Sequence, residues 1–279
     1  MSYQCPICFT PLTQTGHSYQ CQQQHCFDLA KEGYVNLMPV QFKRSKIPGD
    51  SPLMMQARRE FLQAGFYAPL CESAATLLVD YGKTRSSANA FLDIGCGEGY
   101  YTHLVAEKLQ QQFPSIHCYG LDIAKNAVKS AAKSYKNVNF CVGSSYRLPF
   151  ADESLDLLMR IYAPSEANEL HRVLTPEGLL IAVTPAPMHL QQYKALIYDN
   201  VRLHSEELEE IKGFTIVERK RLTYQIELDN KQRINLLQMT PFAWRANEHV
   251  IDSLTNCNML FNCDIDFYIT VYKRQTLCQ

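Results

Sequence analysis

The chain has 279 residues, of which 46% are hydrophobic, and a formal net charge of −1 at pH 7. This length accommodates one large α/β domain and a small module, and the near-neutral charge gives no global attraction to nucleic acid. No apolar run reaches the roughly 20 residues that a membrane helix needs, and no basic region followed by an apolar core marks the start. With eleven cysteines, mostly scattered, we predict a reduced, cytoplasmic protein without membrane spans.

The first cysteines have the spacing of a metal site. A C-x2-C pair, twelve residues and a C-x3-H pair supply four ligands: Cys5, Cys8, Cys21 and His25. This pattern suits tetrahedral zinc, and four protein ligands leave no open position for catalysis. Cys26 is an alternative ligand beside His25. A redox pair is the other interpretation, but it normally begins a helix after a strand, and too few residues precede Cys5 for that. We therefore predict a structural zinc module over residues 1–35.

A linker and helical segment follows over residues 36–80. It contains a basic stretch, Lys43-Arg44-Ser45-Lys46, bounded by Pro39 and Pro52. Such a stretch is placed to contact a phosphate backbone, and a solvated linker is the alternative interpretation.

The most informative stretch is residues 90–101. Residues 90–94 are apolar enough for a buried strand, and the spacing from Tyr100 onward is that of a helix. Between them lies a glycine turn, which lets backbone N–H groups approach a nucleoside closely because no Cβ intervenes. Dinucleotide enzymes need G-x-G-x-x-G. Here the pattern is G-x-G-x-G after an acid, formed by Asp93, Gly95, Gly97 and Gly99, and the shorter turn counts against a dehydrogenase.

The following segments alternate strands and helices. Residues 116–122 are predicted to form a strand ending in Asp122, whose carboxylate can accept both ribose hydroxyls of a nucleoside. Capping of the helix at 124–135 is its alternative role. Further strands are predicted at 138–142, after Asp152, and at 179–184, 214–222 and 266–272. We therefore predict a Rossmann-like α/β domain over residues 81–279, with a seven-stranded, mostly parallel sheet.

The glycine turn resembles the first motif of the class I S-adenosylmethionine (SAM) methyltransferases, in which the amino acid part of the cofactor lies across the glycines. The run from Ser144 to Phe150, followed by Asp152-Glu153-Ser154-Leu155-Asp156, resembles a later motif of the same enzymes. That motif usually has Asp where Ser144 stands. We therefore expect Ser144, Ser145 or a backbone carbonyl to bind the adenine amino group.

Longer strings at residues 31–37, 54–67, 160–164 and 237–245 resemble the bacterial methyltransferases that modify guanine N1 in a hairpin loop of 23S ribosomal RNA. The resemblance runs from Cys5 to about residue 270. It implies a cytoplasmic homodimer whose zinc module helps to hold the RNA hairpin. It also implies that the four predicted ligands bind zinc and that SAM is bound by Tyr67, Gly99, Tyr100 and His189.

The chemistry of guanine N1 sets a further requirement. N1 carries a proton near neutral pH, so a general base, or stabilisation of the charge developing on O6, should be present. We hypothesise that Arg160 supports the O6 charge and that Tyr162 borders or stacks on the base. An ion pair with an acid such as Asp156 is the alternative for Arg160, and no carboxylate stands out as the base. Trp244, the only tryptophan, is interpreted as packing rather than as an RNA contact.

Two other functions remain open at this stage. A small-molecule SAM methyltransferase would share the cofactor half but would not need the zinc module. A non-catalytic RNA-binding zinc protein would not need the intact glycine turn or Asp122.

Overall fold

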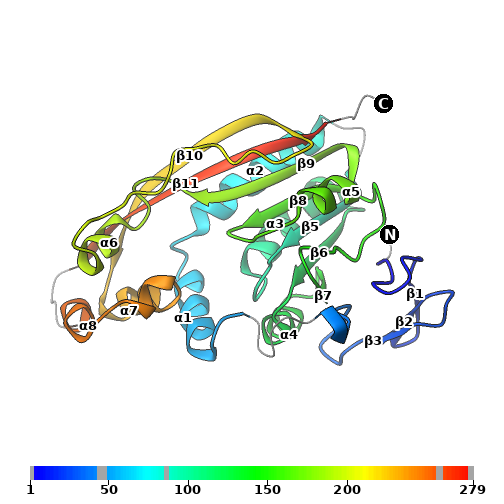
Figure 1. The fold of residues 1–279 in the computed structure, drawn as a ribbon, viewed down its shortest axis with the longest axis horizontal. Helices are drawn as coiled ribbons and strands as arrows, with labels where there is room; N and C mark the ends of the chain where they lie inside the picture. The colour runs from blue at the N-terminus through cyan, green and yellow to red at the C-terminus, as the bar shows by residue number, and fades with distance from the viewer. Residues whose placement is uncertain (1–2, 43–48, 85–87, 256–259, 276–279) are drawn as a thin grey trace.

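The computed structural model describes residues 3–42, 49–84, 88–255 and 260–275. Its main unit is an eight-stranded sheet with helices on both faces (Figure 1). From one edge to the other, the strands are β10 (Phe214–Leu228), β11 (Phe261–Arg274), β9 (Leu174–Pro185), β8 (Leu155–Ile161), β5 (Ala90–Ile94), β6 (His117–Asp122), β7 (Asn139–Val142) and β4 (Val35–Asn36).

The strand directions bring the predicted site residues to one edge of the sheet. The six strands from β9 to β4 are parallel, whereas β11 runs antiparallel to both β9 and β10. The carboxyl ends of β5, β6, β7 and β8 therefore lie side by side, which is where ligands bind in open α/β sheets. The Rossmann-like, mostly parallel sheet is confirmed, with one more strand than predicted. The additional strand, β4, spans the boundary between the predicted zinc module and the linker.

Two apolar clusters hold the layers together. On one face, Phe91, Leu157 and Met159 pack with α2 (Ala68–Lys83), α3 (Tyr100–Gln112) and α4 (Lys125–Ser134). On the other face, Leu92, Leu158 and Leu180 pack with α5 (Ala167–Val173). Successive strand residues alternate between the clusters because side chains in a strand point to opposite faces.

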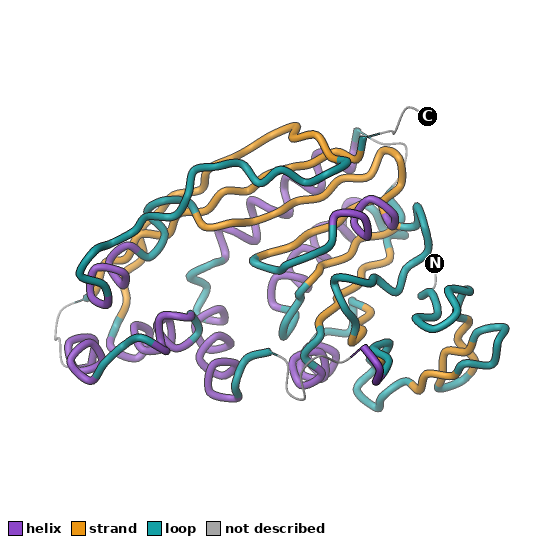
Figure 2. Tube along the Cα trace, viewed as in Figure 1, coloured by secondary structure: helices purple, strands orange, loops and turns teal. Residues whose placement is uncertain are grey.

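A group of helices lies apart from the sheet layers (Figure 2). It contains α1 (Pro52–Gln63), α7 (Asn230–Gln238), the 3-10 helix η2 (Pro241–Trp244) and α8 (Glu248–Thr255), while α6 (Gln191–Ile197) packs on β11. Ser51 caps α1 and is followed by a proline at the first helical position, and Asp229 begins α7 with a capping box. A salt bridge from Arg59 to Glu98 joins α1 to the glycine turn.

The zinc module has a small antiparallel sheet made of β1 (Thr13–Thr15), β2 (Ser18–Gln20) and β3 (Cys26–Asp28), and the 3-10 helix η1 (Val40–Phe42) follows β4. Tyr3 anchors the module to the large domain. Its buried ring contacts Tyr119 and Phe150, with both centroid distances 5.5 Å, and the N–H of Gln4 donates to the carbonyl of Pro149 at 2.9 Å. The short, polar module is thus stabilised in part by packing against the core of the large domain.

No helix among the described residues has the length and apolar character needed to cross a membrane. The basic stretch at residues 43–46 lies outside the described residues.

Candidate active site and zinc centre

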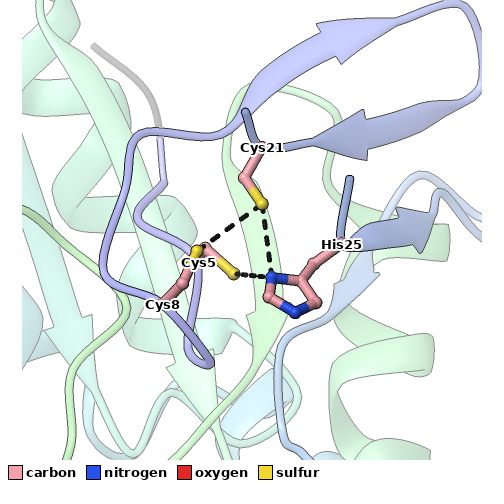
Figure 3. A group of neighbouring side chains, drawn as sticks. All are labelled: Cys5, Cys8, Cys21 and His25. Carbon is pink, nitrogen blue, oxygen red and sulfur yellow. Dashed lines mark hydrogen bonds between the residues drawn. The ribbon is translucent and has the colours of Figure 1, made fainter. Parts of the chain in front are cut away.

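The four predicted zinc ligands converge (Figure 3). Their ligand atoms all lie within 4.8 Å of one another. The Nδ1 atom of His25 is 3.6 Å from the sulfur of Cys5 and 3.4 Å from that of Cys21, and the sulfurs of Cys8 and Cys21 are 3.6 Å apart. With Zn–S bonds of about 2.3 Å, the edge of a tetrahedron is about 3.8 Å, and Zn–N bonds are shorter, so these spacings fit one zinc ion. Cys26 is exposed at the start of β3 and is not part of the cluster.

The three turn glycines have different surroundings. All have positive φ, with values of +77° at Gly95, +54° at Gly97 and +82° at Gly99. A Cβ on Gly95 would lie 2.5 Å from that of Ala163, and one on Gly99 would lie 3.0 Å from the ring of Phe140. A Cβ on Gly97 would meet no atom within 4 Å. Gly95 and Gly99 therefore permit close packing of the turn, whereas Gly97 leaves open space above it.

Asp122 links the glycine turn to the neighbouring strand. Its carboxylate accepts the N–H of Gly97 at 2.9 Å and the N–H of Ala124, at the start of α4, at 2.7 Å. Asp122 thus orders the entry to a helix and also faces the turn. Its oxygens retain lone pairs that can accept hydroxyl groups. Burial raises the pKa of this carboxyl, while the two N–H bonds oppose that rise.

Asp93 lies beneath the turn rather than at its surface. Its carboxylate is almost completely buried and accepts the hydroxyl of Thr102, in α3, at 2.6 Å. Burial is the main reason that the pKa of Asp93 is raised from 3.8 to about 7, and the charge on Asp122 adds to the rise. The observed contact of Asp93 ties strand β5 to helix α3.

The titration of Asp93 predicts how stability depends on pH. Its folded pKa lies above the unfolded value, so its favourable contribution is complete below about pH 4 and is lost as pH rises through about 7. We expect the free energy of unfolding of Asp93→Asn, which keeps an acceptor for Thr102, to depend less on pH. The difference from the wild type should change by on the order of 4 kcal/mol across this range in denaturant titrations. If the free energies of unfolding of Asp93→Asn and wild type changed equally with pH, this prediction would be contradicted.

Ser144 lies just beyond the carboxyl end of β7, next to Asp122. Its hydroxyl oxygen accepts the N–H of Tyr146 at 3.2 Å, and the N–H of Gly143 donates to the carbonyl of Asp122 at 3.0 Å. Ser144 therefore shares the edge of the sheet with the glycine turn, and its contact with adenine stays a prediction.

Three of the predicted residues meet around Phe267 of β11. The ring centroid of Phe267 is 5.2 Å from that of Tyr67, 6.1 Å from that of Tyr162 and 4.5 Å from that of His189. Tyr67 is buried directly before α2. Tyr100 is not part of this group, because it begins α3 immediately after the turn.

The surroundings of His189 determine which of its ring nitrogens carries the proton. The backbone N–H of Asp266 donates to its Nδ1 at 3.3 Å, and burial lowers the pKa of His189 to about 3, so the neutral ring carries its proton on Nε2. That Nε2 lies 3.3 Å from the hydroxyl oxygen of Tyr162 and donates to it. Tyr162 has a φ of +57° and is 49% exposed. The hydroxyl of Tyr162 accepts this bond and keeps its own proton.

Arg160 is buried and paired. Its guanidinium forms a salt bridge with Glu209 and donates to the hydroxyl of Ser165 at 3.2 Å. The ion-pair interpretation holds, but with Glu209 instead of Asp156. Asp156 accepts backbone N–H groups from Asn89 and Ala90.

Two findings differ from, or add to, the sequence-based predictions. Trp244 is 77% exposed, so the packing interpretation of this residue is wrong. Asp266 was not predicted as a site residue. Its buried carboxylate accepts two bonds from Arg221 and one from the N–H of Met188, and thereby holds the loop that carries His189. An acid within the apolar run of β11 is the only sequence signal for this role.

Comparisons with known proteins agree with this geometry. The family described as "RlmA, N-terminal" matches residues 3–46, and a methyltransferase domain family matches residues 85–235. The 23S rRNA (guanine(748)-N(1))-methyltransferase of Streptomyces fradiae is 32% identical over 253 residues, covering 87% of this chain and 86% of that protein. The chain belongs to this methyltransferase family.

A second relative in the family is YxjB of Bacillus subtilis (strain 168), which is also named as a 23S rRNA (guanine-N(1)-)-methyltransferase. It is 29% identical over 276 residues, which cover 96% of each chain. The family uses SAM as the methyl donor, and its N-terminal zinc ribbon coincides with the Cys5, Cys8, Cys21 and His25 cluster. This chain is accordingly a SAM-dependent methyltransferase with a structural zinc site.

Proposed function

We propose that the protein transfers a methyl group from SAM to N1 of a guanine in a hairpin loop of 23S ribosomal RNA. The observation that carries this proposal is the bond from Gly97 N–H to Asp122, in a chain whose relatives are named for guanine-N1 methylation. It joins a glycine turn to an acid at the end of the next parallel strand. The zinc module packed beside this edge favours a large substrate over a small molecule.

The site residues divide into two groups in this proposal. SAM lies across the turn and supplies an electrophilic methyl group on a positively charged sulfur. We assign the binding of SAM to two sets of residues. The first belongs to the glycine turn and its flanks: Asp93, Gly95, Gly97, Gly99 and Tyr100. The second comes from other parts of the chain: Tyr67, Asp122, Ser144 and His189. Asp93 acts from beneath the turn by holding α3. Asp122 accepts the ribose hydroxyls, and Ser144 faces the adenine.

Arg160 and Tyr162 are assigned to the guanine. The hydroxyl of Tyr162, held by His189, borders the base and donates a hydrogen bond to it. Arg160 lies near the end of β8, two residues before Tyr162, and stabilises the charge on O6, either directly or through the order it imposes on residues 163–165. Removal of the N1 proton becomes easier when O6 carries stabilised negative charge.

Arg160→Lys should slow methyl transfer with little change in SAM affinity. Lysine keeps the charge toward Glu209 but loses the planar group that also reaches Ser165. We expect the single-turnover rate to fall by roughly tenfold to a hundredfold, measured by quenched-flow with methyl-labelled SAM. Glu209→Gln is the matched control, because it removes the ion pair and leaves the guanidinium. An unaltered rate in Arg160→Lys would eliminate the catalytic role of Arg160.

One experiment tests the function as a whole. The protein is incubated with methyl-labelled SAM and total ribosomal RNA from cells lacking the gene, and the modified nucleoside is mapped. Label in 1-methylguanosine of 23S rRNA is the expected result. Label confined to a small-molecule fraction would favour a small-molecule methyltransferase, and absence of SAM binding would favour a non-catalytic RNA-binding protein. Comparison of free 23S rRNA with ribosomal precursors identifies the natural substrate.

The homodimer and the cytoplasmic location are the remaining parts of the proposal. Sedimentation equilibrium of the zinc-loaded protein tests the first, and fractionation of cells tests the second.

A further inference from the structure

A cation lies between two aromatic rings on the surface beside the zinc module. The guanidinium carbon of Arg147 is 4.6 Å from the ring centroid of Phe9 and 4.4 Å from that of Phe42. These residues come from three parts of the chain: the knuckle after Cys8, the helix η1 and the loop after β7. We call this arrangement the Phe9–Arg147–Phe42 stack.

The stack is exposed although its rings are apolar. Phe9 is 53% exposed and Phe42 is 41% exposed. Three further large side chains close in sequence to the stack are also exposed, namely Ile7, Val40 and Tyr146. Two exposed aromatic rings held against a cation indicate a binding surface.

The backbone at Phe9 argues that its ring is not there for folding. Phe9 has a φ of +62°, in the left-handed region that favours glycine. The bonds from Phe9 N–H to the carbonyl of Cys5 and from Cys5 N–H to the carbonyl of Thr10 hold this conformation within the zinc knuckle. Glycine would meet the same backbone requirement at lower cost. The phenyl ring adds its contact with Arg147 and an exposed face.

Arg147 has charge available for a ligand. No salt bridge joins it to a carboxylate among the described residues. Contact with a ring leaves the N–H groups at the edge of the guanidinium, and these groups fit phosphate oxygens. The outer faces of the two rings can accept bases, since stacking on an aromatic side chain requires no particular base.

The stack lies next to the methyl-transfer site. The N–H of Arg147 donates to the carbonyl of Ser144 at 3.2 Å, and Ser144 follows β7, the parallel neighbour of the strand that ends in Asp122. Figure 1 shows the zinc module and β7 in the same part of the molecule. A substrate held at the stack therefore reaches the edge of the sheet where the cofactor residues lie.

We propose that this stack binds single-stranded RNA, with the edge of Arg147 on a backbone phosphate and Phe9 and Phe42 each stacking on an unpaired base beside it. This inference rests on the proposed function and names the surface that holds the loop next to the target guanine. A polyanion with unpaired bases matches both a cation that forms no salt bridge within the described part of the chain and two exposed rings. A protein partner would match the rings alone.

The variant Phe9→Gly separates binding from folding. Glycine relieves the left-handed backbone, so the thermal stability of the zinc-loaded protein should stay the same or rise. Loss of one stacking ring should weaken RNA affinity about tenfold. We measure this by fluorescence anisotropy with a labelled RNA stem-loop that has a guanine-containing loop. A blunt RNA duplex of the same stem should bind Phe9→Gly and wild type equally. A less stable Phe9→Gly protein with unchanged RNA affinity would assign the ring a purely structural role and overturn the proposal.

The variant Arg147→Ala tests the phosphate contact through salt dependence. For single-stranded RNA, loss of one phosphate contact should lower the slope of log Kd against log salt concentration by about 0.7. Arg147→Lys should keep most of that slope because the charge remains, and Phe9→Gly should leave the slope unchanged. Lys108→Ala is the matched control. It removes an equal charge from the C-terminal half of α3, where Lys108 pairs with Glu72, and it should not affect the slope.

Failure of this inference differs from failure of the proposed function. If wild type methylates 23S rRNA and Phe9→Gly and Arg147→Ala bind and methylate it equally well, the stack has no role in RNA binding. If wild type transfers no methyl group to RNA, the proposed function is wrong, and the anisotropy comparison still decides whether the stack binds RNA.

Discussion

Cys8→Ser is expected to abolish the folding of the zinc module and leave the sheet domain folded. Structural zinc contributes about 10–16 kcal/mol in small zinc modules. The described part of this module has only short strands and a few buried side chains of its own. Serine does not replace a thiolate in the Cys5, Cys8, Cys21 and His25 cluster, so the site loses one of its four ligands. The amides of residues 3–28 should then exchange with solvent within seconds in hydrogen-exchange mass spectrometry.

The large domain should respond only locally. Tyr3 and Leu12 leave the second apolar cluster when the module unfolds, which exposes Tyr119 and Phe150. The glycine turn and Asp122 lie outside this contact, so SAM affinity measured by calorimetry should be close to that of wild type. Cys26→Ser is the matched control, because Cys26 is exposed outside the cluster and the protein should keep one zinc per chain. Protected amides and bound zinc in Cys8→Ser would refute the prediction.

The parts of the fold that follow from local pattern were predictable from the sequence. The turn at Gly95, Gly97 and Gly99 and the spacing of the zinc ligands are local, because glycine freedom and ligand geometry act over a few residues. The strands β5, β6 and β8 are uniformly or almost uniformly buried and read as apolar runs. The family resemblance supplied Tyr67 and His189, which no local pattern marks as site residues.

The parts that depend on distant partners were not predictable in this way. Strand β4 has only two residues, and it becomes a strand by pairing with β7 more than a hundred positions away. The ion pair of Arg160 with Glu209 spans 49 positions. The sequence alone favours Asp156 as the partner, because Asp156 is closer along the chain. The contact between Phe9 and Arg147 joins two modules. Tertiary packing decides each of these, and a single sequence contains no periodic signal for it.

Gly97→Ala should fold almost normally but lose affinity for SAM. A Cβ at Gly97 meets no protein atom within 4 Å, so the cost to folding is the left-handed backbone at φ +54°, about 1 kcal/mol. The same Cβ projects into the open space above the turn, where the proposed cofactor approaches the N–H that faces Asp122. We expect the Kd for SAM to rise by tenfold or more in calorimetry, with the melting temperature lowered by only a few degrees.

Gly95→Ala should behave in the opposite way, and the pair of variants therefore separates ligand binding from packing. Its Cβ would lie 2.5 Å from that of Ala163, which adds overpacking of about 1–3 kcal/mol to the cost of a φ of +77°. A large fall in melting temperature is expected, and Ala163→Gly in the same chain should restore part of it by removing the contact. If Gly97→Ala binds SAM as tightly as wild type, the glycine serves only the turn. The acid at the end of β6 would then act as a helix cap, and the cofactor would have to lie elsewhere.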